Sequence, residues 1–346
     1  MKQQAPEYAK LPTIVDVARL AGVSKSTVSN VIRDAACVAP AMRARVTEAI
    51  EALAYRPNVL ARQLVQQRTT IIGVVVGDLA NPFHAEMAKQ IELHAAARGY
   101  RVMFVNTQAD EVDAASLEKL LEYRVAGIVF LAHAGMPERA RHLLADRLPV
   151  VFVACRADWG DVVSGEDRRG AGEATRHLLS LGHRRIAYFA DPIVEDAADR
   201  ERRAGYRTVM TEAGLQPMVF HWRRSPPGLL RNNREVTPET LLLGERRVTA
   251  IFSSNDLGAI EILDCADRLG IQVPAGLSVV GFDDIVLARL ARINLTTVVQ
   301  PKEKLAELAI DTLSARLAGS LPAGYVQRTV DLRLVIRGST APPVRG

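Results

Sequence analysis

The stretch AGVSKSTVSNVI, Ala21 to Ile32, decides the fold of the N-terminal end of this chain. Its central residues GVSKST look like the end of a P-loop, which needs glycines six residues and one residue before its lysine so that bare backbone N–H groups can close around phosphates. Those two places hold Arg19 and Ser24, whose side chains would fill the cradle, and no strand precedes them. The sequence therefore disfavours a nucleotide triphosphate site.

The residues around this stretch predict two short helices joined by a tight turn. Thr13 can cap a helix whose third residue is Asp16, a carboxylate that favours the positive helix N-terminus. Gly22 suits the left-handed residue that often ends a helix, and Ser24 is a good cap for the next one. Apolar residues recur at helical spacing along the inner face of both helices: Ile14, Val17, Ala18, Ala21, Val28, Val31 and Ile32.

The outer face of the second helix carries Lys25, Ser26, Ser29, Asn30 and Arg33, and no acidic residue. Side chains of these types hydrogen-bond to base edges and phosphates. A helix, a short glycine-containing turn and a polar second helix are typical of a helix-turn-helix. The pattern alone leaves open an ordinary amphipathic helical hairpin with a solvated face.

The distribution of charge favours a nucleic-acid partner at this end. The chain has 346 residues, enough for two or three domains, and 48% of them are hydrophobic, enough for a sizeable core. Its formal net charge is +5. Residues 1–70 hold ten Lys/Arg and five Asp/Glu, whereas the remainder holds 34 of each. All the excess positive charge therefore lies at the N-terminal end, as expected if only that end meets a polyanion.

Several absences bear on the location of the protein. The N-terminus has no apolar h-region that would mark a secretory signal, and no run approaches the ~18 apolar residues that would span a membrane. Cys37, Cys155 and Cys265 are far apart, odd in number and without a C-x-x-C pair, so they predict reduced thiols rather than disulfides or a zinc site. We therefore expect a cytoplasmic, nucleoid-associated protein with no membrane partner.

A third helix is predicted over about 41–53, with Arg43 and Arg45 available for phosphates. The segment RPNVLARQLVQQRTT follows. Its Pro57-Asn58 pair is a stop followed by a cap, and residues 59–65 are long enough for only about two helical turns, which are marginal alone in water. Two interpretations stay open: a flexible linker, or a segment that orders on DNA and pushes an apolar wedge into the minor groove.

Longer strings now resemble a known family. TIVDVARLAGVSKSTVSNVI and YRPNVLARQL are similar to the head and hinge of the LacI/GalR family of bacterial transcription regulators. LANPFHAEM, LGHRRIAYF, RRAGYRTVM, FSSNDLGAIEIL, SVVGFDDI, LTTVVQP and LVIRGSTAP resemble that family's effector domain, in order over nearly the whole chain. The resemblance implies a sequence-specific repressor whose affinity for operator DNA is controlled by a small-molecule effector, a sugar or another polar metabolite.

The resemblance also implies how the protein would hold double-stranded operator DNA. A homodimer would place two recognition helices in successive major grooves of a pseudopalindromic site. Lys25, Ser26 and Asn30 would read bases. Backbone phosphates would be held by Thr13, Ser24, Thr27, Ser29 and Asn58. In the hinge, Leu64 would insert at a central base step next to Ala61 and Arg62 and bend the duplex.

Apolar runs of strand length alternate with helical stretches over the rest of the chain. The runs are IIGVVV, RVMFVN, GIVFL, PVVFV, RIAYFA, TAIFSS and LSVVGF, and the helical stretches are residues 83–98, 168–181, 200–213 and 256–269. This alternation predicts an α/β fold with parallel sheets covered on both faces. The resemblance implies two lobes joined by three crossing strands, as in the periplasmic binding-protein fold.

The expected domains follow from these predictions. Residues 1–56 form the helix-turn-helix DNA-binding domain, 57–70 the hinge, and 71–340 the effector-binding and dimerisation domain. Within the last, lobe 1 is expected at about 71–162 and 292–321, and lobe 2 at about 163–291 and 322–340.

In such sheets a ligand binds at the carboxyl ends of the strands. Residues at or near these ends are the candidates for the effector site: Asp78, Asn81, Phe83, His84, Asn255, Asp256 and Asp283. By resemblance, Arg202, Asn255 and Asp283 lie where sugar-binding members of the family hold effector hydroxyls. Asn255 could instead only cap the following helix, and His84 could be an ordinary core or surface histidine. A buried Arg202 needs an acid or the effector as its partner.

The sequence departs from the family pattern at several places. Ala154-Cys155 stand where an acid usually follows the fourth strand, and VSGED, residues 163–167, replaces an acid–Asn pair. These changes weaken the assignment to a neutral sugar and leave room for another polar metabolite. In the head, Ala39 replaces the hydroxyl residue that usually caps the third helix, at a cost of about 1 kcal/mol of local stability.

Two other classes of protein fit less well. A binding protein serving a transporter would share the two lobes but would lack the basic head and need export. A nicotinamide enzyme should show G-x-G-x-x-G after its first strand, and IIGVVVGDLANPF does not. No nucleophile elbow, HExxH motif or nucleophile–base pair is present, so we expect no enzyme activity, cofactor or metal. The identity of the effector, its direction of action, the regulated genes and the choice between dimer and tetramer stay open.

Overall fold

The computed structural model describes residues 11–33, 38–56, 69–107, 114–132, 138–144, 147–190, 197–224, 227–231, 234–236, 241–243 and 247–344. The chain divides into two compact units, Met1–Thr69 (the head) and Thr70–Gly346 (the effector unit). The predicted hinge contacts Asn58, Ala61, Arg62 and Leu64 lie outside the described residues. Among the helices described, none has the length and apolar character needed to cross a membrane.

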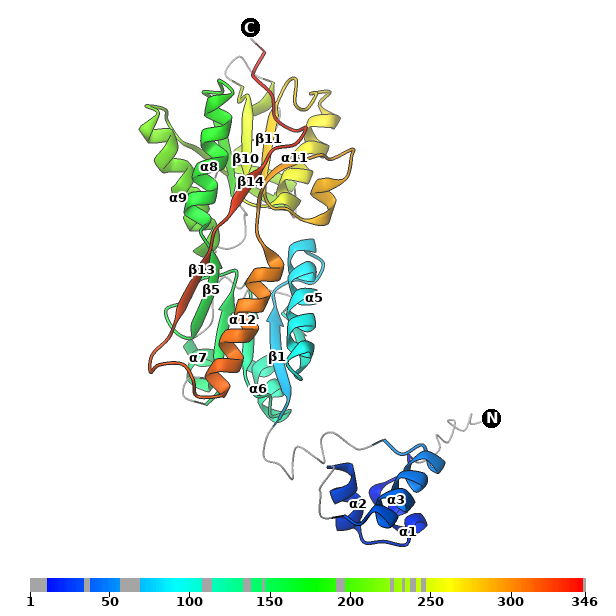
Figure 1. Ribbon diagram of the computed structural model, residues 1–346. Helices are drawn as coiled ribbons and strands as arrows, with labels where there is room; N and C mark the ends of the chain where they lie inside the picture. Colours follow the sequence, from blue (N-terminus) through cyan, green and yellow to red (C-terminus); the bar gives the residue numbers. More distant parts are fainter. Residues whose placement is uncertain are drawn as a thin grey trace, which may run out of the picture. The chain divides into compact units, whose positions relative to one another are not determined.

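The described part of the head, residues 11–33 and 38–56, contains three helices, drawn in blue in Figure 1, with the predicted helix-turn-helix at its start. Its helices are α1 (Ile14–Ala21), α2 (Lys25–Ile32) and α3 (Pro40–Ala52). They share one small core, whose buried residues are Val17, Ala18, Ala21, Val28, Val31, Val46, Ala49 and Tyr55. The helical spacing of apolar residues therefore predicted the packing faces correctly.

The turn between α1 and α2 depends on glycine and on an arginine from α3. Gly22 has φ 61°, in the left-handed region, and a Cβ added there would lie 2.5 Å from Nη2 of Arg45. That guanidinium donates to the Ala21 carbonyl oxygen at 2.5 Å, so it satisfies the end of α1. Nη2 of Arg45 is therefore committed to the turn, and a phosphate contact by the rest of this exposed guanidinium stays a prediction.

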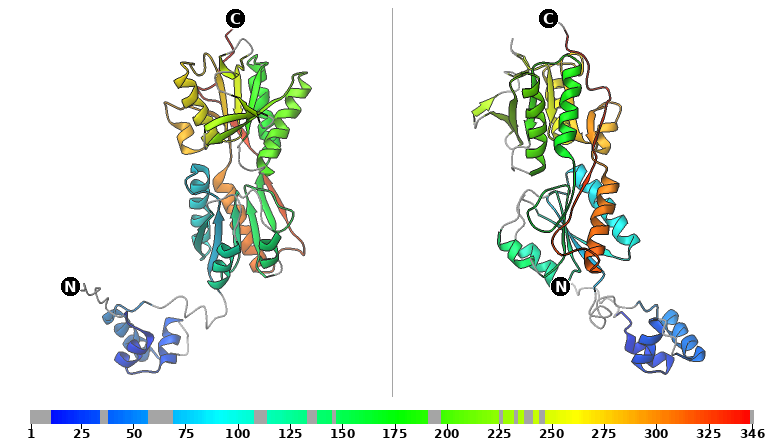
Figure 2. Two further views of the ribbon diagram at one scale, coloured as in Figure 1. Left: turned by 180° about the vertical axis from the view of Figure 1, so that it is seen from behind. Right: turned by 60° about the vertical axis from the view of Figure 1, so that its left-hand side comes forward.

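One six-stranded sheet forms the first lobe of the effector unit, in the order β13-β5-β4-β3-β1-β2, with all its pairs parallel. Its strands are β1 (Ile71–Val76), β2 (Arg101–Asn106), β3 (Ile128–Leu131), β4 (Val150–Val153), β5 (Asp161–Gly165) and β13 (Gln327–Val330). Its helices are α5 (Pro82–Ala97), α6 (Ala114–Glu122), α7 (Glu138–Leu144) and α12 (Lys302–Leu317). Helices α5 and α12 lie side by side on one face of the sheet (Figures 1 and 2).

The second lobe has an eight-stranded sheet in the order β14-β12-β11-β10-β6-β7-β8-β9. Its strands are β6 (Ile186–Ala190), β7 (Met218–Arg224), β8 (Pro227–Arg231), β9 (Arg234–Val236), β10 (Ala250–Ser253), β11 (Ser278–Asp283), β12 (Thr296–Val299) and β14 (Arg333–Val335). Strands β7, β6, β10, β11 and β12 pair in parallel. The helices are α8 (Asp167–Ser180), α9 (Ala197–Glu212), α11 (Asp256–Arg268) and the 3-10 helix η1 (Val286–Arg289).

The chain crosses between the lobes three times, but later in the sequence than expected. It leaves the first sheet after β5, returns after β12 and leaves again after β13. Residues 296–299 therefore belong to lobe 2 and residues 327–330 to lobe 1, against the expected boundaries near 291 and 321. The place of residues 296–299 was missed because β12 continues the parallel order beside β11. The place of residues 327–330 was missed because β13 is an edge strand with alternating exposed residues rather than an apolar run.

Candidate functional site

Helix α2 presents the residues predicted to read DNA. The Ser24 side chain caps the helix, since its Oγ accepts from the Thr27 backbone N–H at 3.1 Å. Lys25 and Ser26 are exposed, whereas Ser29 and Asn30 are half-buried along the same helix. The helix has no acidic residue in its first turn, so nothing there repels a phosphate or competes for the lysine. The geometry suits major-groove contacts by short polar side chains.

The other predicted head contact, Thr13, is engaged in capping α1. Its backbone N–H and its hydroxyl both donate to Oδ2 of Asp16, at 2.9 and 2.7 Å. Thr27 likewise lies with its Oγ1 2.9 Å from Ser24 Oγ. A phosphate contact by either threonine therefore has to share or replace a local hydrogen bond.

In the effector unit, Arg202 joins three segments at the strand ends of lobe 2. Its Nε donates to Oδ1 of Asp167 at 2.9 Å, and its Nη1 donates to the Ser254 carbonyl oxygen at 2.7 Å. Asp283 Oδ1 lies 3.8 Å from the same Nη1, and the guanidinium stacks 3.9 Å from the Phe282 ring centroid. Arg202 is only 8% exposed, so two buried acids are its counter-charges.

The predicted residues of lobe 1 gather in the loop between β1 and α5. Asn81 caps α5 by accepting from the Phe83 N–H at 3.0 Å, and Phe83 is buried. His84 Nδ1 lies 2.9 Å from the Asp78 carbonyl oxygen, while the Asp78 carboxylate accepts from the Ala80 N–H at 2.8 Å. Local hydrogen bonds therefore fix the conformation of this loop, which directly follows the carboxyl end of β1.

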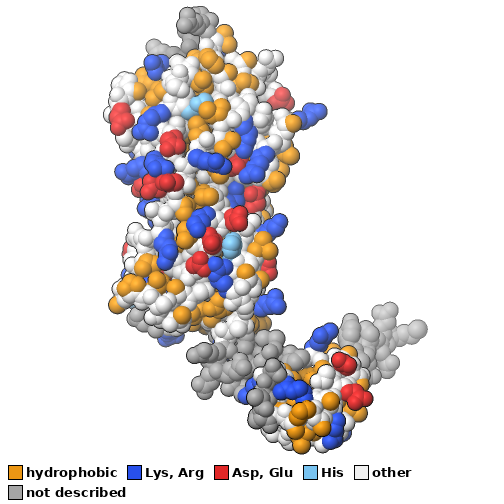
Figure 3. Space-filling view, viewed as in Figure 1, with side chains coloured by type: hydrophobic (Ala, Val, Ile, Leu, Met, Phe, Trp, Pro, Cys, Tyr) orange, Lys and Arg blue, Asp and Glu red, His pale blue; other side chains and the backbone are white. Residues whose placement is uncertain are grey.

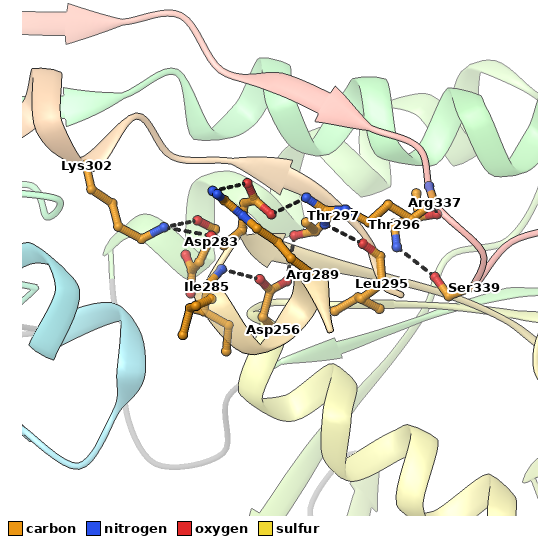
Figure 4. Close-up of polar contacts among 12 residues, drawn as sticks. Asp256, Asp283, Ile285, Arg289, Leu295, Thr296, Thr297, Lys302, Arg337 and Ser339 are labelled. Carbon is orange, nitrogen blue, oxygen red and sulfur yellow. Dashed lines mark hydrogen bonds and ion pairs between the residues drawn. The ribbon is translucent and has the colours of Figure 1, made fainter. Parts of the chain in front are cut away.

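Lys302 links the Arg202 cluster of lobe 2 to the loop between β1 and α5 of lobe 1. Its Nζ donates to the carbonyl oxygens of Asp283 and Asp284 at 2.7 and 2.9 Å (Figure 4). The same Nζ lies 5.8 Å from the Phe83 ring centroid. Both aspartates have positive φ, 116° and 51°, a strained conformation for residues with a side chain. The structure therefore places Phe83 and Asp283, which come from different lobes, around one ammonium group.

Glu86 on α5 completes this contact between the lobes. Its Oε2 lies 3.3 Å from Lys302 Nζ, and its Oε1 accepts from the Val286 backbone N–H at 2.8 Å. The contact with Val286 crosses between the lobes, so a movement of lobe 2 relative to α5 has to change it, whereas the contact with Lys302 lies within lobe 1.

Asn255 and Asp256 have different roles. Asn255 caps α11, since its Oδ1 accepts from the Gly258 N–H at 2.7 Å, and Asn255 itself is half-buried. Asp256 is fully buried, where it accepts from the Ile285 N–H at 2.9 Å and from Thr297 Oγ1 at 2.5 Å (Figure 4). Asp256 therefore holds β12 and the end of β11 in place, and its carboxylate is not presented to a ligand.

Burial controls the electrostatics of this site. Desolvation raises the pKa of Asp283 to about 6, against the opposing effects of Arg202 and of the hydrogen bond from Gln300. Desolvation also raises the pKa of Asp167, again opposed by Arg202. The pKa of Asp256 lies well above its usual value because of burial and the nearby Asp283. Asp167 and Asp283 share one guanidinium, and burial shifts both carboxyl groups toward the protonated form.

Among the residues of this site that were not predicted contacts are Asp167, Gln300 and Lys302. Gln300 directly follows β12, and its Nε2 donates to Asp283 Oδ1 at 2.9 Å. The rule that ligands meet strand ends would have found Gln300 if residues 296–299 had been recognised as a strand of this sheet. No local signal marks the other two, since each meets its partner only through the fold. Among the described residues, no group of His, Cys, Asp and Glu could hold a metal ion.

Comparisons with known proteins agree with this architecture. Residues 13–58 match the family described as Bacterial regulatory proteins, lacI family, and residues 175–340 match the Periplasmic binding protein-like domain. The chain is 36% identical over 340 residues to the HTH-type transcriptional regulator GalR of Salmonella typhimurium, covering 96% of this chain and 97% of that protein. It is 35% identical over 326 residues to the Ribose operon repressor of Escherichia coli (strain K12), covering 89% and 93% respectively.

The fold is also similar to that of a solved regulator. The crystal structure of the Lac repressor dimer bound to operator and the anti-inducer ONPF matches with a TM-score of 0.80 at 26% identity, over 96% of this chain and 100% of that one. A helix-turn-helix head joined to a two-lobed α/β unit with polar strand ends defines a ligand-responsive transcriptional regulator, not an enzyme. The chain belongs to the lacI family of bacterial regulatory proteins.

Proposed function

We propose that this regulator represses transcription as a homodimer that inserts the α2 helices of its two heads into successive major grooves of a pseudopalindromic operator. Lys25, Ser26 and Asn30 contact base edges. The backbone phosphates are held by Thr13, Ser24, Thr27, Ser29 and Asn58. The observation that carries this proposal is the outer face of α2, which is polar, free of acid and oriented by the Ser24 cap.

The hinge completes DNA binding in this proposal. Residues 58–66 order on the operator, and Leu64 enters the minor groove beside Ala61 and Arg62, where an apolar side chain unstacks a base step and bends the duplex. Support comes from the sequence of this segment, which combines an apolar tip, a small neighbour and a cation. Leu64→Ala should keep the contacts of α2 but lose the bend and roughly a few kcal/mol of affinity.

The effector is a small polar metabolite, a sugar or another hydroxylated compound, held between the lobes. Arg202, Asp283 and Asn255 face it from lobe 2, and Asp78, Phe83 and His84 face it from lobe 1. Support comes from the pairing of Arg202 with two buried acids, because charge-assisted hydrogen bonds of this kind clamp hydroxyl groups strongly. A ligand that competes for Asp283 also disturbs Lys302 and Glu86, which link the lobes.

Selection of operator sequences from random DNA tests the DNA-binding part. The full-length chain should enrich a palindromic site and bind it as a dimer in a gel shift and in sizing with DNA. Lys25→Ala should weaken that binding, and Lys304→Ala, an exposed substitution on α12 that leaves the head untouched, should not. A chain that selects no sequence contradicts the proposal. The effector part is tested by calorimetry with a panel of sugars and polar metabolites, followed by operator binding with each compound that gives heat.

A further inference from the structure

A groove of about 390 Å³ runs between α8 and α9 on the flank of the effector unit. Its volume lies within the range of roughly 300–1,000 Å³ that is usual for small-molecule sites. The groove shares no residue with the predicted effector site. Its walls are formed by Arg156, Glu166, Arg168, Arg169, Gly172, Arg176, Gly205, Thr208, Val209 and Thr329.

The walls of the groove are rich in arginine. Four arginines face the groove against one acid, Glu166. Figure 3 shows basic and acidic side chains crowded on this flank, where α8 and α9 approach the crossing strands. The acids around the groove serve two of the arginines. Arg168 pairs with Glu201 at 3.0 Å, and Arg169 pairs with Asp331 at 3.0 Å. The Nε of Arg169 also lies 3.9 Å from Glu166 and 3.7 Å from Glu173.

The two other arginines, Arg156 and Arg176, are exposed. Within the described part of the chain, neither guanidinium makes a hydrogen bond or an ion pair. Arg176 folds back over its own helix, since a Cβ added at Gly172 would lie 3.3 Å from its Nη1. The absence of a side chain at Gly172 thus leaves room for this guanidinium on the groove wall. Thr208 and Thr329 are exposed and add hydroxyl donors.

The groove also spans the two lobes. Thr329 lies on β13, in the sheet of lobe 1, and Arg156 lies in the loop that follows β4 of the same sheet. Arg168 and Arg176 lie on α8 in lobe 2. Burial raises the pKa of Asp167, the partner of Arg202, and the nearby charge of Arg156 partly opposes this rise. A ligand held by Arg156 and Arg176 together would therefore bridge the lobes beside the predicted effector site.

We propose that this groove binds a small metabolite that carries phosphate groups, with at least two negative charges, at a site separate from the effector site. Guanidinium groups bind phosphate oxygens through paired N–H donors, and two uncommitted arginines with two threonine hydroxyls match a diphosphate-like group. The ligand neutralises the charges of Arg156 and Arg176 and joins the lobes through these two residues.

Calorimetric titration of the full-length protein with inorganic pyrophosphate, at constant ionic strength, tests this site. The double variant Arg156→Gln/Arg176→Gln should bind pyrophosphate about tenfold more weakly or worse, because both uncommitted guanidiniums are lost. The matched control Arg184→Gln/Arg207→Gln removes two exposed arginines outside the groove and should bind within about twofold of the parent. Pyrophosphate should also raise the unfolding midpoint of the parent and the control but not of the double variant.

The outcomes separate this site from other anion binding. Equal affinity in the parent and the double variant would place the pyrophosphate elsewhere, such as on the basic head, and would overturn the proposal. Absence of binding to the parent would do the same. Citrate that binds as tightly as pyrophosphate would overturn the assignment to phosphate. None of these measurements involves operator DNA or the effector, so their failure is distinct from failure of the proposed function.

Discussion

The head and the effector unit position their functional side chains in opposite ways. In the head, Lys25 and Ser26 are exposed and depend on a helix that is capped by its immediate neighbour Ser24. In the effector unit, Arg202 and Asp283 are buried and held by residues far away in the sequence. The predicted DNA-reading surface can therefore be changed with little effect on folding, whereas the predicted effector site is part of the core of its lobe.

The largest expected effect tests the buried side of this comparison. Arg202→Ala should lower the free energy of unfolding of the effector unit by about 3–5 kcal/mol, because it leaves Asp167 and Asp283 buried without their counter-charge. Chemical denaturation of the full chain, followed by circular dichroism, measures this loss. Calorimetry should show no effector binding by the folded variant.

Arg268→Ala is the matched control, since Arg268 pairs with Asp264 on the surface of α11 and both side chains are about two-thirds exposed. Its stability should change by at most about 1 kcal/mol. Equal stability of the parent and Arg202→Ala would mean that water reaches the two acids, and that the contrast between head and effector unit is smaller than the structure indicates.

The same contrast explains what the sequence could predict. The inner and outer faces of α2 follow from helical spacing, and β1, β3, β4, β6, β10 and β11 follow from apolar runs, because both signals are local. The edge strand β13 carries no such signal. The pairing of Arg202 with Asp167 and the position of Lys302 depend on which strands become neighbours, so they could not be read from spacing. Candidate strand ends were predictable, but not the network that joins them.

A second prediction concerns pH. Burial raises the pKa of Asp283 from its usual 3.8 to about 6, so the folded protein binds this proton more tightly than the unfolded chain does. The stability that this proton contributes is complete below about pH 3.8 and is lost as the pH rises through 6. The loss is on the order of 3 kcal/mol for a shift of this size. The variant Asp283→Asn carries no titrating proton at this position, so it should not show this loss of stability.

The measurement is the free energy of unfolding of the parent and of Asp283→Asn between pH 4 and pH 7. The difference between the two proteins should change in favour of the variant across this range and level off above about pH 6. Asp264→Asn, on the exposed surface of α11, should run parallel to the parent. A constant difference between the parent and Asp283→Asn would show that Asp283 is ionised throughout, with Arg202 outweighing burial.

The third prediction tests the exposed side of the comparison. Asn30→Ala should leave the head folded but cost on the order of 1–3 kcal/mol of operator affinity at one symmetric pair of base positions. Sequence selection from random DNA should show relaxed preference at that pair. Glu51→Ala, an exposed substitution on α3, should leave the selected sequence unchanged. The same selected sequence for Asn30→Ala and the parent would mean that another residue of α2 reads this base.

The smallest effect compares two caps within the head. Ser24 caps α2 through a hydrogen bond from Thr27, whereas Ala39 begins α3 without any side-chain bond, although its φ of −57° and ψ of 141° and the following Pro40 suit a cap. Ala39→Ser should therefore stabilise the head by about 1 kcal/mol, and Ser24→Ala should destabilise it by a similar amount.

Amide exchange at Val46, in the head core, reports both changes without interference from the larger unit. Slower exchange in Ala39→Ser with an unchanged operator sequence would show that the stability of the head and its reading of DNA are separable. If the added hydroxyl leaves exchange at Val46 unchanged, the start of α3 is already satisfied by water, and the missing cap carries no cost.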